Sequence, residues 1–75
     1  MESVKVLDAT GLACPMPIVR TKKAMVELES GQVLEIHTTD MGFKNDLSSW
    51  AAAGGHELVK HDTEGSILKF WVKKG

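Results

Sequence analysis

Residues 7–17, with the sequence LDATGLACPMP, mark the point where the chain changes from an extended pattern to a helical one. Before them, residues 4–9 alternate weakly between polar and apolar side chains, which predicts a strand. From residue 15 to about residue 28, apolar positions recur every three or four residues, as on one side of a helix: Ile18, Thr21, Met25 and Leu28. Proline is tolerated in the first turn of a helix because the N–H groups there have no intrahelical partner. The stretch therefore predicts a strand, a loop and a helix capped by Cys14.

Three more strands and a second helix are expected in the rest of the chain. Ser30-Gly31-Gln32 is expected to end the first helix, and Gly54-Gly55 to end the second. Thr39 or Asp40 is expected to cap the second helix. The remaining predictions are strands at 33–38, 57–62 and 66–73, a helix from about 43 to 53 with Trp50 in the core, and a hairpin turn at 63–65.

The resulting order, βαβαββ, predicts an α+β two-layer sandwich formed by one domain, residues 1–75. The first helix is a right-handed crossover between two parallel strands. Both helices must then cover one face of a four-stranded mixed sheet. The other face stays open, and Trp71 is expected there beside Ile67. In that position Trp71 could anchor a partner or a dimer, or pack under a chain terminus.

Composition excludes several classes of function. Nine basic and ten acidic residues give a net charge of −1, so neither direct nucleic-acid binding nor attraction to an acidic membrane is expected. No apolar run reaches the roughly 20 residues of a membrane span, and the start lacks the pattern of a signal peptide. One cysteine cannot form an internal disulfide. We expect a small, soluble, cytoplasmic domain without membrane insertion.

Cys14 is the candidate reactive residue. As the N-cap it would place Pro15 at the first helical position and Pro17 at the third, leaving the Met16 N–H free in the first turn. That N–H and the positive end of the helix dipole both favour a thiolate, which is the nucleophilic form of cysteine. We expect a thiol pKa on the order of one unit or more below the ordinary value of about 8.5. The alternative is an inert, buried cysteine.

Charged residues near this helix are candidates for attracting an anion or an acidic partner. Arg20, Lys22 and Lys23 lie in the first half of the expected helix, where cations oppose the helix dipole. The alternative is a solvated face with a Lys23–Glu27 pair. Asp40 is expected to be a cap or turn residue, with partner recognition as the alternative. The histidines lack the spacing of zinc ligands, so no metal site is expected: His37, His56 and His61.

The motif resembles the opening of the TusA-like (SirA-like) sulfur-carrier family, whose mark is Leu-Asp, a Gly-Leu turn and Cys-Pro-x-Pro. The likeness spans nearly the whole chain, and its later matches are Gly31-Gln32, Thr39-Asp40 and the segment 55–58. It implies a sandwich similar to the C-terminal domain of translation initiation factor three. Two positions depart from the pattern. Met16 stands where members that thiolate tRNA have glutamate, and Met41 stands where proline often follows the aspartate.

The resemblance implies a sulfur carrier with sulfurtransferase-like activity. Cys14 would hold sulfane sulfur as a persulfide, with Pro15, Met16 and Pro17 as its scaffold and no resident cofactor. The implied partners are a sulfur donor of the cysteine desulfurase or rhodanese type and an acceptor protein such as a DsrE-like one. Two alternatives stay open. One is a noncatalytic interaction or regulatory domain that uses the Trp71 face, and the other is a carrier of selenium or thiosulfate-derived sulfur.

Overall fold

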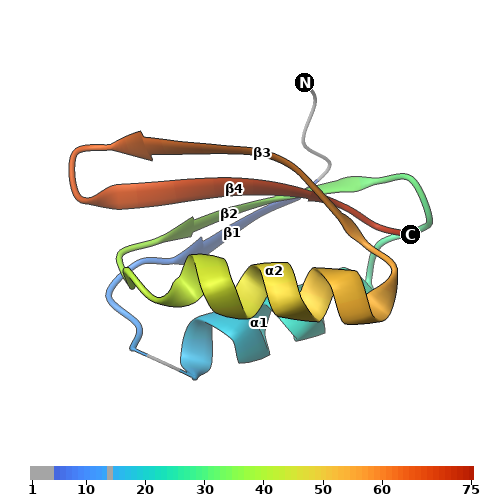
Figure 1. The fold of residues 1–75 in the computed structure, drawn as a ribbon, viewed down its shortest axis with the longest axis horizontal. Helices are drawn as coiled ribbons and strands as arrows, with labels where there is room; N and C mark the ends of the chain where they lie inside the picture. Colours follow the sequence, from blue (N-terminus) through green and yellow to red (C-terminus); the bar gives the residue numbers. More distant parts are fainter. Residues whose placement is uncertain (1–4, 14) are drawn as a thin grey trace.

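The computed structural model describes residues 5–13 and 15–75 and confirms the predicted element order (Figure 1). The elements are β1 Lys5–Ala9, α1 Met16–Val26, β2 Val33–Thr38, α2 Phe43–Gly54, β3 Glu57–Glu64 and β4 Ile67–Lys73. The sheet has the order β1-β2-β4-β3, with β1 and β2 parallel and the other pairs antiparallel. Both helices lie on one side of it, as a two-layer sandwich requires. The β3–β4 hairpin is longer than predicted, since β3 runs to Glu64.

The core lies between the sheet and the two helices. Residues of β2 alternate strictly, so Leu34 and Ile36 are fully buried while Glu35 and His37 lie on the opposite face. The other large buried apolar side chains are Met25, Leu28, Phe43, Leu47, Phe70 and Val72. Full burial of such a side chain contributes about 1.5–3 kcal/mol. Trp50, predicted to be a core residue, is only half-buried and packs at the margin.

Helix α1 turns its predicted apolar stripe (Ile18, Thr21, Met25 and Leu28) toward the core, but the helix ends earlier than expected. Thr21 is fully buried in the stripe because its hydroxyl donates a hydrogen bond of 2.8 Å to the Pro17 carbonyl one turn earlier. The helix ends at Val26, although Leu28 still packs in the core. The prediction that Gly31 ends this helix is wrong. Its N–H instead donates to the Lys74 carbonyl, so Gly31 forms the turn that leads into β2.

Helix α2 begins at Phe43, as predicted, but its N-cap is not one of the predicted residues. Gly42 is the N-cap, so the prediction of Thr39 or Asp40 is wrong. Asp40 instead forms the preceding turn: its carboxylate accepts the Gly42 N–H, and its carbonyl accepts the Phe43 N–H. The other end follows the prediction, because Gly55 adopts a left-handed conformation with φ of 74° at the C-cap.

Candidate functional site

Two loops meet where the parallel strands end and both helices begin (Figure 1). One leads from β1 to α1 and contains residues 10–13, and the other leads from β2 to α2 and contains residues 39–42. They are joined by a hydrogen bond of 3.0 Å from the Gly11 N–H to Oγ1 of Thr39. The carboxyl ends of parallel strands are a common place for binding sites, because loops and helix N-termini converge there. We call this region the carboxyl-end site.

The predicted nucleophile, Cys14, lies outside the described residues, but its neighbours correct the predicted cap. Pro15 is the N-cap of α1, so Met16 is the first helical residue and Pro17 the second. The Met16 N–H donates to the Ala13 carbonyl at 2.9 Å, closing a turn before the helix starts. The Met16 N–H is therefore not free for a thiolate, and the prediction that it would be free is wrong. Both prolines still occupy positions that lack an intrahelical donor bond.

A hollow of about 480 Å³ lies between the two loops. Its lining residues are Gly11, Leu12, Ala13, Thr39, Asp40 and Met41. Asp40 is thus beside the loop that precedes Cys14, although its carboxylate is engaged in its own turn. Three apolar side chains at this end of the molecule are unusually exposed: Met41 at 79%, Val19 at 42% and Met16 at 40%.

Asp8 fixes the first turn of the β1–α1 loop. Its Oδ1 accepts hydrogen bonds from the Thr10 hydroxyl at 2.6 Å and the Thr10 N–H at 3.1 Å. These bonds hold the pKa of Asp8 below its ordinary value, and the charge of His37 on the adjacent strand adds a smaller effect. The loop therefore leaves β1 in a direction set by one carboxylate.

Replacing Thr10 by valine is expected to raise the pKa of Asp8 toward its ordinary value, because the strongest hydrogen bond to the carboxylate is lost. A lowered folded-state pKa stabilises the fold above the ordinary pKa of about 3.9, and this contribution is lost as pH falls through the lower value. The Thr10→Val variant should therefore lose less stability on acidification. An NMR titration of the Asp8 carboxyl carbon measures the change, with Thr63→Val as control. An unchanged Asp8 titration in Thr10→Val would contradict the assignment.

The three basic candidates of α1 do not share one surface. Arg20 and Lys23 line a hollow beside β1, together with Lys5. Lys22 lines a different hollow, next to Trp50. Lys23 lies in the last turn of α1, where a cation favours the helix dipole, so the predicted opposition to the dipole is wrong for this residue.

The Lys23–Glu27 pair of the alternative interpretation is also absent from the described residues. Glu27 is the C-cap of α1 and forms an ion pair with Lys5 of β1 instead. Hydrogen bonding to Lys5 and its positive charge hold the pKa of Glu27 below the ordinary value. The ion pair therefore links the C-terminus of the crossover helix to the edge strand.

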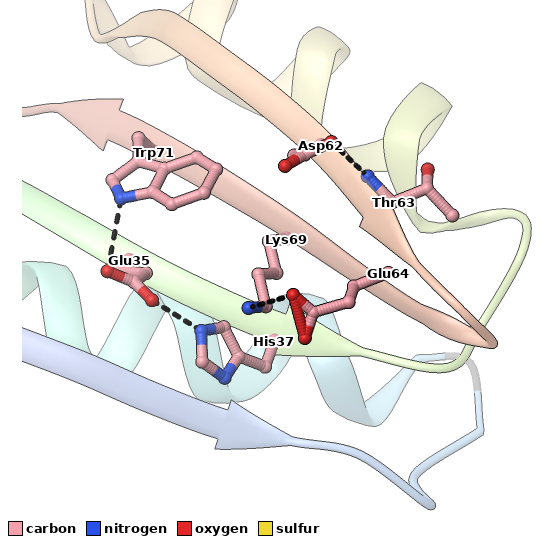
Figure 2. A network of polar contacts seen from close by, with 7 residues as sticks. All are labelled: Glu35, His37, Asp62, Thr63, Glu64, Lys69 and Trp71. Carbon is pink, nitrogen blue, oxygen red and sulfur yellow. Dashed lines mark hydrogen bonds and ion pairs between the residues drawn. The ribbon is translucent and has the colours of Figure 1, made fainter.

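Trp71 lies on the open sheet face, as predicted, within a network of polar side chains (Figure 2). Its indole N–H donates to Glu35 at 3.1 Å, and Glu35 also contacts His37. The Lys60 ammonium lies over the indole ring, 5.0 Å from its centre. The polar group of Trp71 thus has a partner within the chain.

The described part of the chain was also searched for metal-binding groups and for membrane-spanning helices. Residues 5–13 and 15–75 contain no group of His, Cys, Asp or Glu arranged to hold a metal ion. No helix among these residues is long and apolar enough to cross a membrane.

Sequence reasoning missed Thr39 as a loop partner and Met41 at the carboxyl-end site, and Lys5 at the opposite end of β1. For Lys5 a signal existed, since it alternates with Leu7 and so lies on the helix side of β1.

Comparisons with known proteins agree with this architecture. The chain is 69% identical to YrkI of Bacillus subtilis (strain 168), with both chains fully covered. It is 44% identical over 68 residues to the sulfur carrier protein TusA of Allochromatium vinosum, covering 91% of this chain and 90% of the relative. The crystal structure of a SirA-like protein from Desulfitobacterium hafniense superposes with a TM-score of 0.84 at 26% identity, covering 96% of this chain and 99% of that one. Residues 5–74 match the family described as Sulfurtransferase TusA, and the chain belongs to that family.

Proposed function

We propose that this chain carries sulfane sulfur as a persulfide on Cys14 and relays it between two partner proteins. The observation that carries the proposal is the lone cysteine in the Cys14-Pro15-Met16-Pro17 motif of a chain that belongs to the TusA family. Relatives over the full domain are named sulfur carriers. The donor is a protein of the cysteine desulfurase or rhodanese type, and the acceptor is a second thiol protein, of which a DsrE-like protein is one example.

The chemistry requires only one nucleophilic sulfur in the carrier. The Cys14 thiolate attacks the outer sulfur of a donor persulfide, so a new sulfur–sulfur bond forms on Cys14 and the donor's own bond breaks. The donor leaves as a thiolate, and the proton of the persulfide stays on the transferred sulfur. In the second step an acceptor thiolate attacks the same outer sulfur and Cys14 leaves as a thiolate. Neither step needs an external oxidant or reductant.

Several described residues support this exchange. Helix α1 begins at Met16, within the motif, and the positive end of its dipole favours an anionic sulfur nearby. The exposed apolar residues Met16, Val19 and Met41 offer a partner protein a contact surface at the same end of the molecule. Arg20, Lys22 and Lys23 attract acidic partners from the α1 side, and Asp40 contributes to their recognition beside the loop.

Incubation with a cysteine desulfurase and cysteine is expected to add one sulfur atom to Cys14. Intact-mass spectrometry measures the gain, and peptide mapping after alkylation assigns it to the residue. A thiol reductant should remove the added sulfur, because a persulfide is reducible. A rhodanese with thiosulfate provides the second donor class, and a selenium-loaded donor tests the alternative cargo. No gain from either sulfur donor, under conditions that load a known carrier, would refute the proposal.

A further inference from the structure

We propose that the outer edge of β1, with the basic hollow beside it, binds an extended acidic segment of a partner protein. β1 is the terminal strand of the order β1-β2-β4-β3, so in the described sheet only one side of its backbone is paired. Alternate residues of a strand direct their N–H and C=O groups to opposite edges, which leaves hydrogen-bonding groups on the outer side. Such an edge can accept an added strand, whose main chain pairs with it.

The hollow beside this edge is strongly basic. It has a volume of about 380 Å³ and is lined by Lys5 and Leu7 of β1 and by Arg20, Lys23, Ala24 and Glu27, which lie on α1 and its C-cap. Three cations and one carboxylate thus gather in one place on a chain whose net charge is −1. Positive charge is therefore concentrated locally, which favours an acidic ligand.

Two of the three cations are available to such a ligand. Lys5 forms an ion pair with Glu27, the one carboxylate of the hollow. Arg20 and Lys23 are both exposed, and neither forms an ion pair with any other described residue. Because the internal carboxylate is already engaged, Arg20 and Lys23 can each receive a carboxylate from outside.

The arrangement selects an extended acidic segment over other occupants. Side chains two residues apart on a strand point to the same side, so acidic residues at positions i and i+2 would both face α1. A second copy of this chain would bring another Lys5 to the same edge, and lysine at an edge discourages such pairing. A free inorganic anion would make only exposed ion pairs, which are weak, whereas a peptide adds main-chain hydrogen bonds.

The location connects this surface with sulfur transfer. The hollow lies beside the start of β1 and the C-terminal half of α1, and β1 runs from there to Ala9, directly before the loop that contains Cys14. A segment held along β1 would dock its parent protein next to the carboxyl-end site. The inference rests on the proposed function, because the parent protein is taken to be the sulfur donor or acceptor.

A blocked seven-residue peptide of alternating glutamate and valine is the probe. Added to the ¹⁵N-labelled protein at low salt, it should shift the amide signals of residues 5–9 and slow their hydrogen exchange. The double charge reversal Arg20→Glu/Lys23→Glu should weaken binding at least about tenfold, since two attractive pairs become repulsive. The control Lys44→Glu/Lys73→Glu changes the net charge equally with exposed lysines outside the hollow, and should bind nearly as well as the parent chain.

A second probe tests strand pairing separately from charge. Replacing the central valine of the peptide by proline keeps its charges but removes a backbone donor and disfavours pairing, so the shifts in β1 should largely vanish. Equal binding of the proline peptide, equal weakening by both charge reversals, or no shifts in β1 would each overturn the proposal. The peptide titration uses no sulfur donor and no persulfide. A failed titration therefore does not bear on sulfur loading of Cys14, and failed loading does not bear on peptide binding.

Discussion

Replacing Cys14 by serine is expected to abolish sulfur loading and relay completely while the fold stays intact. A serine hydroxyl is not ionised near neutral pH and cannot hold a persulfide, so the effect should be total rather than partial. Intact mass after donor incubation measures loading. Transfer of label from a ³⁵S-loaded donor to an acceptor thiol protein measures the relay.

Two controls separate chemistry from structure in this experiment. Ala13→Ser places the same hydroxyl one residue earlier at an exposed position and keeps Cys14, so it should load normally. The thermal unfolding midpoints of Cys14→Ser and the parent chain should agree closely, because the substitution replaces one sulfur atom by oxygen and leaves the rest of the side chain unchanged. A serine variant that still gains sulfur would assign the cargo to another group and remove Cys14 from the mechanism.

Phe43→Ala is expected to lower the free energy of unfolding by about 3–5 kcal/mol, the range typical of truncating a buried phenylalanine. Phe43 is 1% exposed and packs edge-on against Phe70, with ring centres 5.4 Å apart, so its removal leaves a cavity between α2 and β4. A single core in a chain of this size rarely supplies more than about 3–5 kcal/mol. The variant should therefore be largely unfolded at 25 °C, as urea titration followed by circular dichroism would show.

The matched control for this loss is Val26→Ala on α1. Val26 is 79% exposed, so its truncation should change the free energy of unfolding by less than about 0.5 kcal/mol. Phe43 also stands next to the site, since its N–H donates to the Asp40 carbonyl. A Phe43→Ala protein that remained as stable as Val26→Ala would show that the core does not depend on the Phe43–Phe70 contact.

The fold could be predicted from the sequence because the apolar residues of its helices and strands recur at regular intervals. The stripe from Ile18 to Leu28 and the alternation around Leu34 and Ile36 each define one buried face, and both are confirmed. The crossover rule then leaves few ways to arrange four strands and two helices. Gly55 was predictable as a helix stop because a left-handed conformation suits glycine.

The N-cap positions were not predictable, because they depend on which of several competing hydrogen bonds forms. The Met16 N–H is taken by Ala13, and the carboxylate of Asp40 is used in a turn instead of a cap. The partner of Glu27 was also missed. Lys23 is close in the sequence, but Lys5 lies opposite in space, and only the packing of α1 on β1 brings them together. Contacts between distant residues of this kind leave no local pattern.

The loop between Ala9 and Pro17 is bounded on both sides by buried residues, whereas most of the loop itself is at least partly exposed. Ala9 belongs to β1 in the sheet, and Pro17 belongs to α1 in the helical layer, so the buried residue on each side of the loop packs within its own element. The exposed residues of the loop can therefore be replaced together by those of a relative without changing the residues of the core. Under the proposed function, grafting residues 10–13 and 16 from a relative would change which proteins contact Cys14, while the sheet and helices stay the same.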